Sequence, residues 1–335
     1  MIRLSLCIAT LNRARFIGAT LDSILAQLEP EAEVIVLDGG STDDTSHVVG
    51  LRATGRDNVR YIREATKSGI DADFDKAVSH ARGEYCWLLA DDDLLKPGAV
   101  AQVLAACREG YALIVVNAEV RSADLSEPLD VQRLPYAQDR VYAGSEMEAL
   151  FADAAYHLTF IGAAVIPRKT WMERDRKSYY GTEFVHVGVI FQAPLVGAAL
   201  VIAEPQIMIR YGNAHWTARA FDIWMFKWPR MLWSFPTVGE RVKQAVVARE
   251  PWRDVRNLIL FRAKGAYGRA EYQRLQRQGA AGLAGFWPSL ISLLPGVFVN
   301  LACVAYVRLL SPRSKGTLLD LYASPYWVGN IIGKH

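Results

Sequence analysis

The first part of the chain alternates short apolar runs with amphipathic segments. Five apolar runs have the length and composition of buried strands, at residues 4–10, 33–37, 59–62, 85–89 and 113–116. Between them, apolar positions recur with a helical period at residues 16–28, 44–51, 74–82 and 99–108. Strands alternating with helices predict an α/β fold, with a mostly parallel sheet and helices on both of its faces.

The pattern is less regular after residue 120. Residues 121–140 are polar and predict a loop or excursion. Beyond them we expect helices at 144–151, from 169, and from 181 to about 196, with strands at 160–166 and 200–210.

The composition changes again after Arg210. Tryptophans and cations interleave within a short span: Trp216, Arg219, Trp224, Lys227, Trp228, Arg230 and Trp233. Residues 283–307 then carry no charge, and Arg308, Arg313 and Lys315 follow. Aromatic and cationic residues beside an apolar stretch are typical of a segment at a membrane surface. A helical subdomain that packs on its own core would show a similar sequence pattern. Pro288 and Pro295 favour a broken, shallow insertion over one continuous span.

Bulk properties exclude some classes of protein. A hydrophobic content of 51% excludes a mainly disordered chain. The formal net charge of +3 gives no argument for a nucleic-acid partner. Four cysteines are scattered without metal-type pairs, so buried free thiols in a reducing cytosol are expected. No signal peptide is expected, since Met1 leads directly into the first predicted strand.

The strongest candidate for chemistry is the run Asp91-Asp92-Asp93, directly after the strand at 85–89. Adjacent carboxylates repel, so a cation or hydrogen-bond donors must compensate them. One interpretation is a Mg²⁺ or Mn²⁺ site shared with substrate phosphates. The other is an acid-rich helix N-terminus with Asp93 as its N-cap. The loops after Thr10, Leu37 and Ala90 should meet at the carboxyl edge of the sheet, where such folds bind ligands.

Four motifs in order resemble a family 2 glycosyltransferase of the GT-A fold, over about residues 3–210. They lie at residues 6–13, 36–45, 81–85 and 90–93, with Pro97 just beyond. Residues 69–77 and 219–224 look like segments of abequosyltransferase-type enzymes of O-antigen assembly.

The resemblance implies roles for donor-side residues. The loop after the first strand would hold the nucleobase through Thr10, Asn12 and Arg13, and Asp71 lies in a donor-side segment. Asp38 matches the base-contacting aspartate; the alternative is an N-cap for a helix starting near Ser41. Asp91 aligns with the acid on the ribose side.

The resemblance also implies a divalent ion, Mn²⁺ or Mg²⁺, that neutralises the leaving diphosphate. Asp92 aligns with the metal ligand, and Asp93 either assists it or caps the next helix. Ala90 stands where the family often has a first acid. His215, in a loop after the last strand, is a further candidate ligand.

Glu183 resembles the family's acidic motif, whose carboxylate deprotonates the acceptor hydroxyl. The family usually has two acids there, whereas this chain has Thr182-Glu183. The alternative is a first-turn glutamate favoured by the helix dipole. His186, one turn later, either contacts the acceptor or packs in the core.

Together these features predict a metal-dependent glycosyltransferase at the cytoplasmic face of the bacterial inner membrane, held there peripherally or monotopically. It would move a sugar from a nucleotide-sugar donor, such as a CDP-linked 3,6-dideoxyhexose, to a polyprenyl-diphosphate-linked saccharide. The expected domains are a GT-A catalytic domain at 1–212, with a donor half at 1–118 and an acceptor half at 119–212, and a membrane-associating helical region at 213–335.

Two alternatives differ in class. A nucleotidyltransferase would need a glycine-rich basic signature near the N-terminus, and the sequence has none there. A non-catalytic membrane scaffold with a degenerate fold would not need Asp38, Asp91, Asp92 and Glu183.

Overall fold

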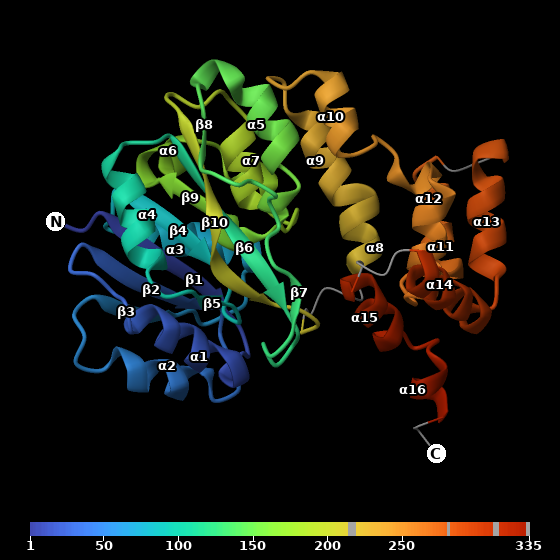
Figure 1. Cartoon of the computed structure of the whole chain (residues 1–335), viewed down its shortest axis with the longest axis horizontal. Coiled ribbons are helices and arrows are strands. Elements are labelled where there is room, and N and C mark those ends of the chain that lie inside the picture. Colours follow the sequence, from blue (N-terminus) through green and yellow to red (C-terminus); the bar gives the residue numbers. More distant parts are fainter. Residues whose placement is uncertain (214–218, 280–281, 311–314, 333–335) are drawn as a thin grey trace. The chain divides into compact units, whose positions relative to one another are not determined.

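The computed structural model describes residues 1–213, 219–279, 282–310 and 315–332. The chain forms two compact units (Figure 1). The first unit comprises Met1–Arg210 and Met231–Val246, and the second comprises Tyr211–Arg230 and Val247–His335. Residues 231–246, which the sequence analysis placed in the C-terminal region, therefore belong to the first unit.

The first unit is built on one mixed sheet. Its strands are β1 (Leu4–Thr10), β2 (Ala32–Asp38), β3 (Val59–Arg63), β4 (Tyr85–Leu89), β5 (Leu94–Leu95), β6 (Leu113–Arg121), β7 (Pro128–Asp130), β8 (Arg140–Tyr142), β9 (Ala164–Pro167) and β10 (Ala199–Arg210). The main order is β3-β2-β1-β4-β9-β6-β10-β5, with β7 paired to β6 and β8 to β10.

The predicted mostly parallel sheet holds for its longer strands, since β10 is also parallel to β6, but β9 and the short strands β5, β7 and β8 are antiparallel to their partners. Strands β3, β2, β1 and β4 are parallel, but β9 is antiparallel to both of its neighbours, β4 and β6. Any strand covered on both faces reads as a continuous apolar run, so the run itself does not encode the strand's direction.

Helices of this unit flank the sheet in Figure 1. They are α1 (Ala14–Leu25), α2 (Thr45–Ala53), α3 (Ile70–His80), α4 (Ala99–Arg108), α5 (Met147–Ala154), α6 (Arg168–Glu173), α7 (Val185–Phe191) and α10 (Glu240–Val246), while α9 (Trp228–Ser234) crosses from the second unit. The helix expected from residue 181 begins only at Val185, because Gly181 and Glu183 have φ of 82° and 75°, which an α-helix does not allow.

The second unit is helical and has its own core. Its elements include α8 (Ala220–Asp222), a π-helical turn (Ile223–Lys227), α11 (Val255–Ala263), α12 (Arg269–Arg277), α13 (Phe286–Leu293), α14 (Gly296–Leu310), α15 (Lys315–Ala323) and α16 (Val328–Ile332). Asn300, the polar residue in the apolar run, is buried and donates to the carbonyls of Ala263 and Leu321. It therefore joins α14 to α11 and α15.

The apolar run forms two helices that meet at a sharp bend. Within the described residues, no single helix is long and apolar enough to cross a membrane. The segments Gly282–Leu293 and Gly296–Leu310 meet that criterion of length and composition only as a pair, bent by 95°.

Gly83 lies where two backbone segments approach closely. Its N–H donates to Ser5 Oγ at 2.9 Å. A Cβ at this position would lie 2.8 Å from the Ser5 backbone nitrogen and 2.9 Å from the Leu4 carbonyl carbon. This contact explains the glycine in the motif at residues 81–85.

Gly83→Ala should therefore lower the free energy of unfolding by about 1–3 kcal/mol, as expected for an overpacked interior. Urea denaturation would measure it. Gly50→Ala is the matched control, since a Cβ there meets no atom within 4 Å. Equal stabilities of the two variants would contradict the close approach at Gly83.

Candidate active site

Three adjacent parallel strands bring the predicted donor-side residues to one edge of the sheet. Thr10 ends β1 and pairs in register with Asp38, which ends β2. Strand β4 lies on the other side of β1 and leads directly to Asp91. The amide of Gly39 donates to the carbonyl of Thr10 at 2.9 Å, so the turn after β2 is tied to the end of β1.

Asp38 is completely buried and organises the turn after β2. Its Oδ1 accepts the amides of Gly40 (3.1 Å) and Ser41 (2.7 Å), and its Oδ2 accepts the Tyr61 hydroxyl at 2.5 Å. Helix α2 begins only at Thr45, so the N-cap interpretation of Asp38 is wrong. The sequence analysis missed Tyr61, whose pKa is raised by burial and by its bond to Asp38.

Hydrogen bonds join the β1–α1 loop to the β2–α2 loop. Asn12, with φ of 55°, accepts the amide of Thr42 at 2.7 Å through Oδ1 and donates its own amide to Ser41 Oγ at 2.8 Å. The amide of Arg13 donates to Thr45 Oγ1 at 2.8 Å. The two loops predicted to hold the nucleobase are therefore pre-ordered against one another.

The Arg13 guanidinium binds the acidic turn after β4. Its Nε donates to Asp91 Oδ1 at 2.9 Å, and its Nη2 donates to Asp92 Oδ2. Burial raises the pKa of Asp91 to about 6, the negative charge of Asp92 adds to this, and the charge of Arg13 opposes it. Two carboxylates from one strand end thus converge on a single cation.

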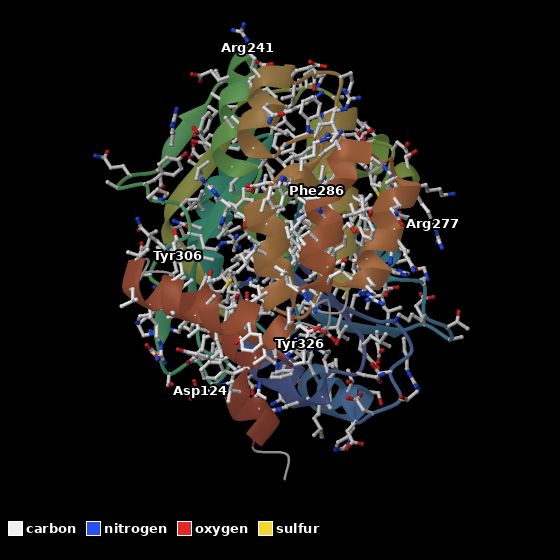
Figure 2. The ribbon with its side chains drawn as sticks, turned by 90° about the vertical axis from the view of Figure 1, so that its right-hand side faces the viewer. Asp124, Arg241, Arg277, Phe286, Tyr306 and Tyr326 are labelled. Atoms are coloured by element: carbon white, nitrogen blue, oxygen red, sulfur yellow. The ribbon has the colours of Figure 1, made fainter. Side chains whose placement is uncertain are left out.

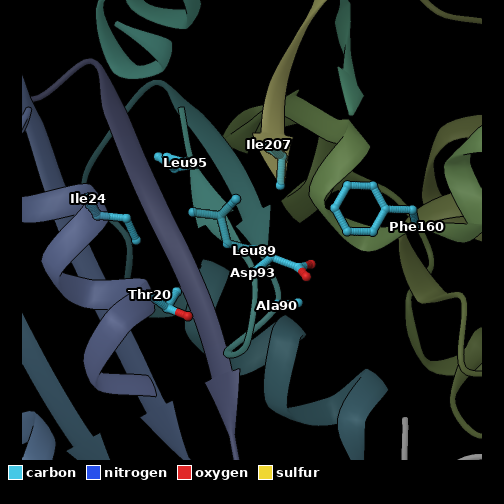
Figure 3. Close-up of a pocket in the computed structure, with 8 residues that line it drawn as sticks. All are labelled: Thr20, Ile24, Leu89, Ala90, Asp93, Leu95, Phe160 and Ile207. Atoms are coloured by element: carbon cyan, nitrogen blue, oxygen red, sulfur yellow. The ribbon is translucent and has the colours of Figure 1, made fainter. Parts of the chain in front are cut away.

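Asp93 points into the protein interior. Its Oδ1 accepts the amide of Arg210, the last residue of β10, at 2.8 Å. Burial and the charge of Asp92 raise its pKa. Figure 3 shows Asp93 in a small, largely apolar pocket lined by Thr20, Ile24, Leu89, Ala90, Asp93, Leu95, Phe160 and Ile207.

The N-cap interpretation of Asp93 is wrong. The residues after it form β5, which pairs with β10, and α4 begins at Ala99 after Gly98, which makes no side-chain cap. A strand follows the acids because Leu94 and Leu95 find a partner in β10 that is distant in sequence.

A divalent ion fits this turn as a partial site. Within the described residues, no group of three or more acidic, histidine or cysteine side chains could hold a metal. Mg²⁺ is usually held by one or two carboxylates, with phosphates and water completing its shell. Asp91 and Asp92 supply such a pair, since they already converge on one cation. His215 lies outside the described residues.

Helix α3 carries acids on different sides. The carboxylate of Asp71 accepts the amides of Gly181, Glu183 and Val185 at 2.8–3.0 Å. Asp73 lies against the turn after β2, because a Cβ on Gly39 would be 3.0 Å from Asp73 Oδ2. The first turn of α3 thus contacts both the turn after β2, where the nucleotide is predicted to bind, and the loop that carries Glu183.

The sequence analysis gave Asp73 no role. It predicted a helix from residue 74, whereas α3 begins at Ile70. With the observed start, Asp73 faces a different side from Asp71 and Asp75, which are one turn apart.

Glu183 is half-buried in the loop before α7. Since α7 starts at Val185, Glu183 is not in the first turn of a helix, and the helix-dipole interpretation is wrong. His186 is buried, and its Nε2 lies 2.7 Å from the carbonyl of Leu158. Burial lowers its pKa to about 4, and the core-packing alternative holds for it.

Comparisons with known proteins agree with this arrangement. The family model described as Glycosyl transferase family 2 matches residues 5–172. Abequosyltransferase RfbV of Salmonella typhimurium is 24% identical over 225 residues, 63% of this chain and 67% of that protein. The GalNAc(5)-diNAcBac-PP-undecaprenol beta-1,3-glucosyltransferase of Campylobacter jejuni is 32% identical over 118 residues. That match covers 35% of this chain and only 38% of the relative, less than two thirds of its length.

Solved structures share the fold. S. aureus TarS 1–349 in complex with UDP superposes with a TM-score of 0.61 at 16% identity, covering 96% of this chain and 89% of that one. Mannosyltransferase PcManGT from Pyrobaculum calidifontis, in complex with GDP-Man and Mn²⁺, gives a TM-score of 0.55 at 18% identity, covering 99% and 88%. The family model spans half of the chain and includes the acidic turn, so the predicted resemblance is confirmed: the chain is a glycosyltransferase and belongs to glycosyltransferase family 2.

Proposed function

We propose that this glycosyltransferase moves a sugar from a nucleotide-sugar donor to a hydroxyl of a lipid-linked saccharide, in O-antigen or related polysaccharide assembly. The observation that carries this proposal is the layout around the first turn of α3. On one side lie the nucleotide-side turn after β2 and Asp73, and on the other lies the Glu183 loop. Donor and acceptor groups are thereby held by one rigid element.

The donor would bind at the carboxyl edge of β1, β2 and β4. Asp38 is completely buried, so donor binding would have to move the Tyr61 hydroxyl away from its Oδ2 before that oxygen could accept a hydrogen bond from the base. Asp91 would face the ribose. Similarity to an abequosyltransferase supports a 3,6-dideoxyhexose, which we propose is carried on CDP.

Glu183 would act as the general base. Its carboxylate takes the proton of the acceptor hydroxyl as that oxygen bonds to the anomeric carbon of the donor sugar. The bond from that carbon to the diphosphate breaks, and its electron pair leaves with the nucleoside diphosphate. A bound Mn²⁺ or Mg²⁺ would stabilise the charge that grows on the diphosphate. Asp92, with Asp91, would hold that ion, and Arg13 would be free to move from the carboxylates to a phosphate oxygen.

The second unit supplies a candidate membrane surface for a polyprenyl-diphosphate-linked acceptor. Along α14, Gly296, Asn300, Val304 and Val307 are buried on one face. The opposite face would normally be polar. Here α13, α14 and the turn before them instead expose Leu283, Phe286, Trp287, Leu290, Leu293, Phe298, Leu301, Tyr306, Leu309 and Leu310.

Exposed apolar surface of this extent is typical of an interaction site. Phe286 and Tyr306 are labelled on the side of these helices that faces the viewer in Figure 2. Aromatic and leucine side chains on a bent helix pair suit shallow insertion among lipid headgroups. The exposed side chains of Arg277 and Arg308 add positive charge that favours anionic lipid. We propose peripheral or monotopic binding at the cytoplasmic face of the bacterial inner membrane. Arg313, also predicted to help, lies outside the described residues.

Asp92→Asn should abolish the metal response of donor binding, because it removes a carboxylate while keeping the side-chain shape. Calorimetry would compare the binding of nucleoside diphosphates with and without Mn²⁺, alongside transfer assays. Asp57→Asn, at an exposed acid, is the control. If the Asp92 variant still binds more tightly with Mn²⁺, or if a chelator leaves the wild type fully active, the metal assignment fails.

Glu183→Gln should lower kcat by about 10²–10⁴-fold, the usual contribution of general-base catalysis. Glutamine keeps the shape of glutamate but cannot take the proton. Steady-state transfer kinetics and donor affinity would be measured together. Unchanged kcat with collapsed donor affinity would instead make Glu183 a donor-site residue.

Replacing Phe286, Leu290 and Phe298 with serine should prevent flotation with anionic liposomes and slow turnover of lipid-linked acceptor. Transfer to a water-soluble acceptor should be unchanged. The control replaces three exposed apolar residues of the first unit with serine: Leu51, Val131 and Val196. A wild-type protein that stays in the soluble fraction would refute the membrane proposal.

A further inference from the structure

The loop that carries Glu183 is held by one carboxylate from another element. Asp71, in the first turn of α3, accepts three backbone N–H groups from a five-residue stretch more than 100 residues later in sequence. Its Oδ2 accepts the amides of Gly181 (2.8 Å) and Glu183 (2.9 Å), and its Oδ1 accepts the amide of Val185 (3.0 Å). Three of the roughly four acceptor sites of the carboxylate are thus used within the protein.

These bonds act on a backbone that would not hold this shape by itself. Glu183 has φ of 75°, in the left-handed region that side chains with a Cβ rarely adopt. Such conformations persist only where several contacts with the surrounding structure hold them in place, and they cluster at functional sites. The alternating amides of residues 181, 183 and 185 all point at Asp71, so the carboxylate fixes both the turn and the direction of the Glu183 side chain.

A second acid of α3 fixes the segment that leads into this loop. Asp75, one turn after Asp71, accepts Trp171 Nε1 at 2.8 Å through Oδ1 and the Tyr180 hydroxyl at 2.6 Å through Oδ2. Arg176 also contacts its Oδ1 at 2.8 Å. The face of α3 with Asp71 and Asp75 is therefore bound to residues 171–185, while Asp73 faces the nucleotide-side turn.

We propose that Asp71 is a positioning residue for the general base, holding Glu183 in its left-handed conformation, and not a ligand of the donor nucleotide. The inference rests on the proposed role of Glu183. Burial raises the pKa of Asp71, whereas the hydrogen bonds from the three amides lower it and so favour the ionised form. An ionised acceptor makes the stronger bonds that a strained loop requires.

The test is a double-mutant cycle between Asp71→Asn and Glu183→Gln. In Asp71→Asn, one carboxylate oxygen becomes an NH₂ group that faces an amide N–H, so the loop shifts. We expect kcat to fall by about 10²-fold, the scale expected when a reacting group is misplaced by about 1 Å. The affinity for nucleoside diphosphate, measured by calorimetry, should stay as in the wild type.

In the Glu183→Gln background, Asp71→Asn should lower kcat by no more than about twofold further, because residues that act as a unit are non-additive. Multiplicative losses would overturn the proposal, and so would loss of nucleotide affinity in Asp71→Asn. An unchanged kcat in Glu183→Gln alone would refute the general-base function proposed for Glu183. That result is distinct from the two results that would refute the positioning role of Asp71.

A structural control separates positioning from general destabilisation. Glu33 is buried at the start of β2 and accepts the amide of Arg82 (2.6 Å) and the Ser5 hydroxyl (2.8 Å). Glu33→Gln should lower the unfolding temperature and leave kcat unchanged. If Asp71→Asn does not fold, Asp71→Glu makes the same test, since it keeps the charge but displaces the loop by one methylene.

Discussion

Three adjacent carboxylates at the end of a buried strand impose the constraint that shapes this candidate active site. Each desolvated acid needs donors, and the donors described for these three acids come from other elements of the fold. Arg13 reaches Asp91 and Asp92 from the β1–α1 loop, and the amide of Arg210 reaches Asp93 from β10. The acidic turn therefore ties the parallel part of the sheet to its mixed part.

Two other buried aspartates of the first unit also accept hydrogen bonds from several donors. Asp38 collects two amides and the Tyr61 hydroxyl, and Asp71 collects three amides from the Glu183 loop. In each case a carboxylate orders a loop that has no regular secondary structure. Loops ordered in this way can position reacting groups closely, because the sheet and α3 supply a rigid base.

The second unit follows a different principle. Its helices bury enough apolar surface to form their own core, with Asn300 joining three of them, yet they leave a second apolar face uncovered. A fold that needed only stability would place polar side chains on that face. The exposed apolar side chains of α13 and α14 therefore do not stabilise the core of the second unit, and they remain available at its surface.

Local periodicity and short motifs were enough to predict the alternation of strands and helices up to residue 116, the acids at the strand ends and the family. The direction of β9, the inward turn of Asp93 and the partners of Asp71 and Arg13 became known only from the folded arrangement. Those features depend on which distant backbone or side-chain group meets each residue. A carboxylate in a sequence can bind a cation, cap a helix or hold a loop equally well, and its role is decided by the donors that folding brings within about 3 Å of its oxygens.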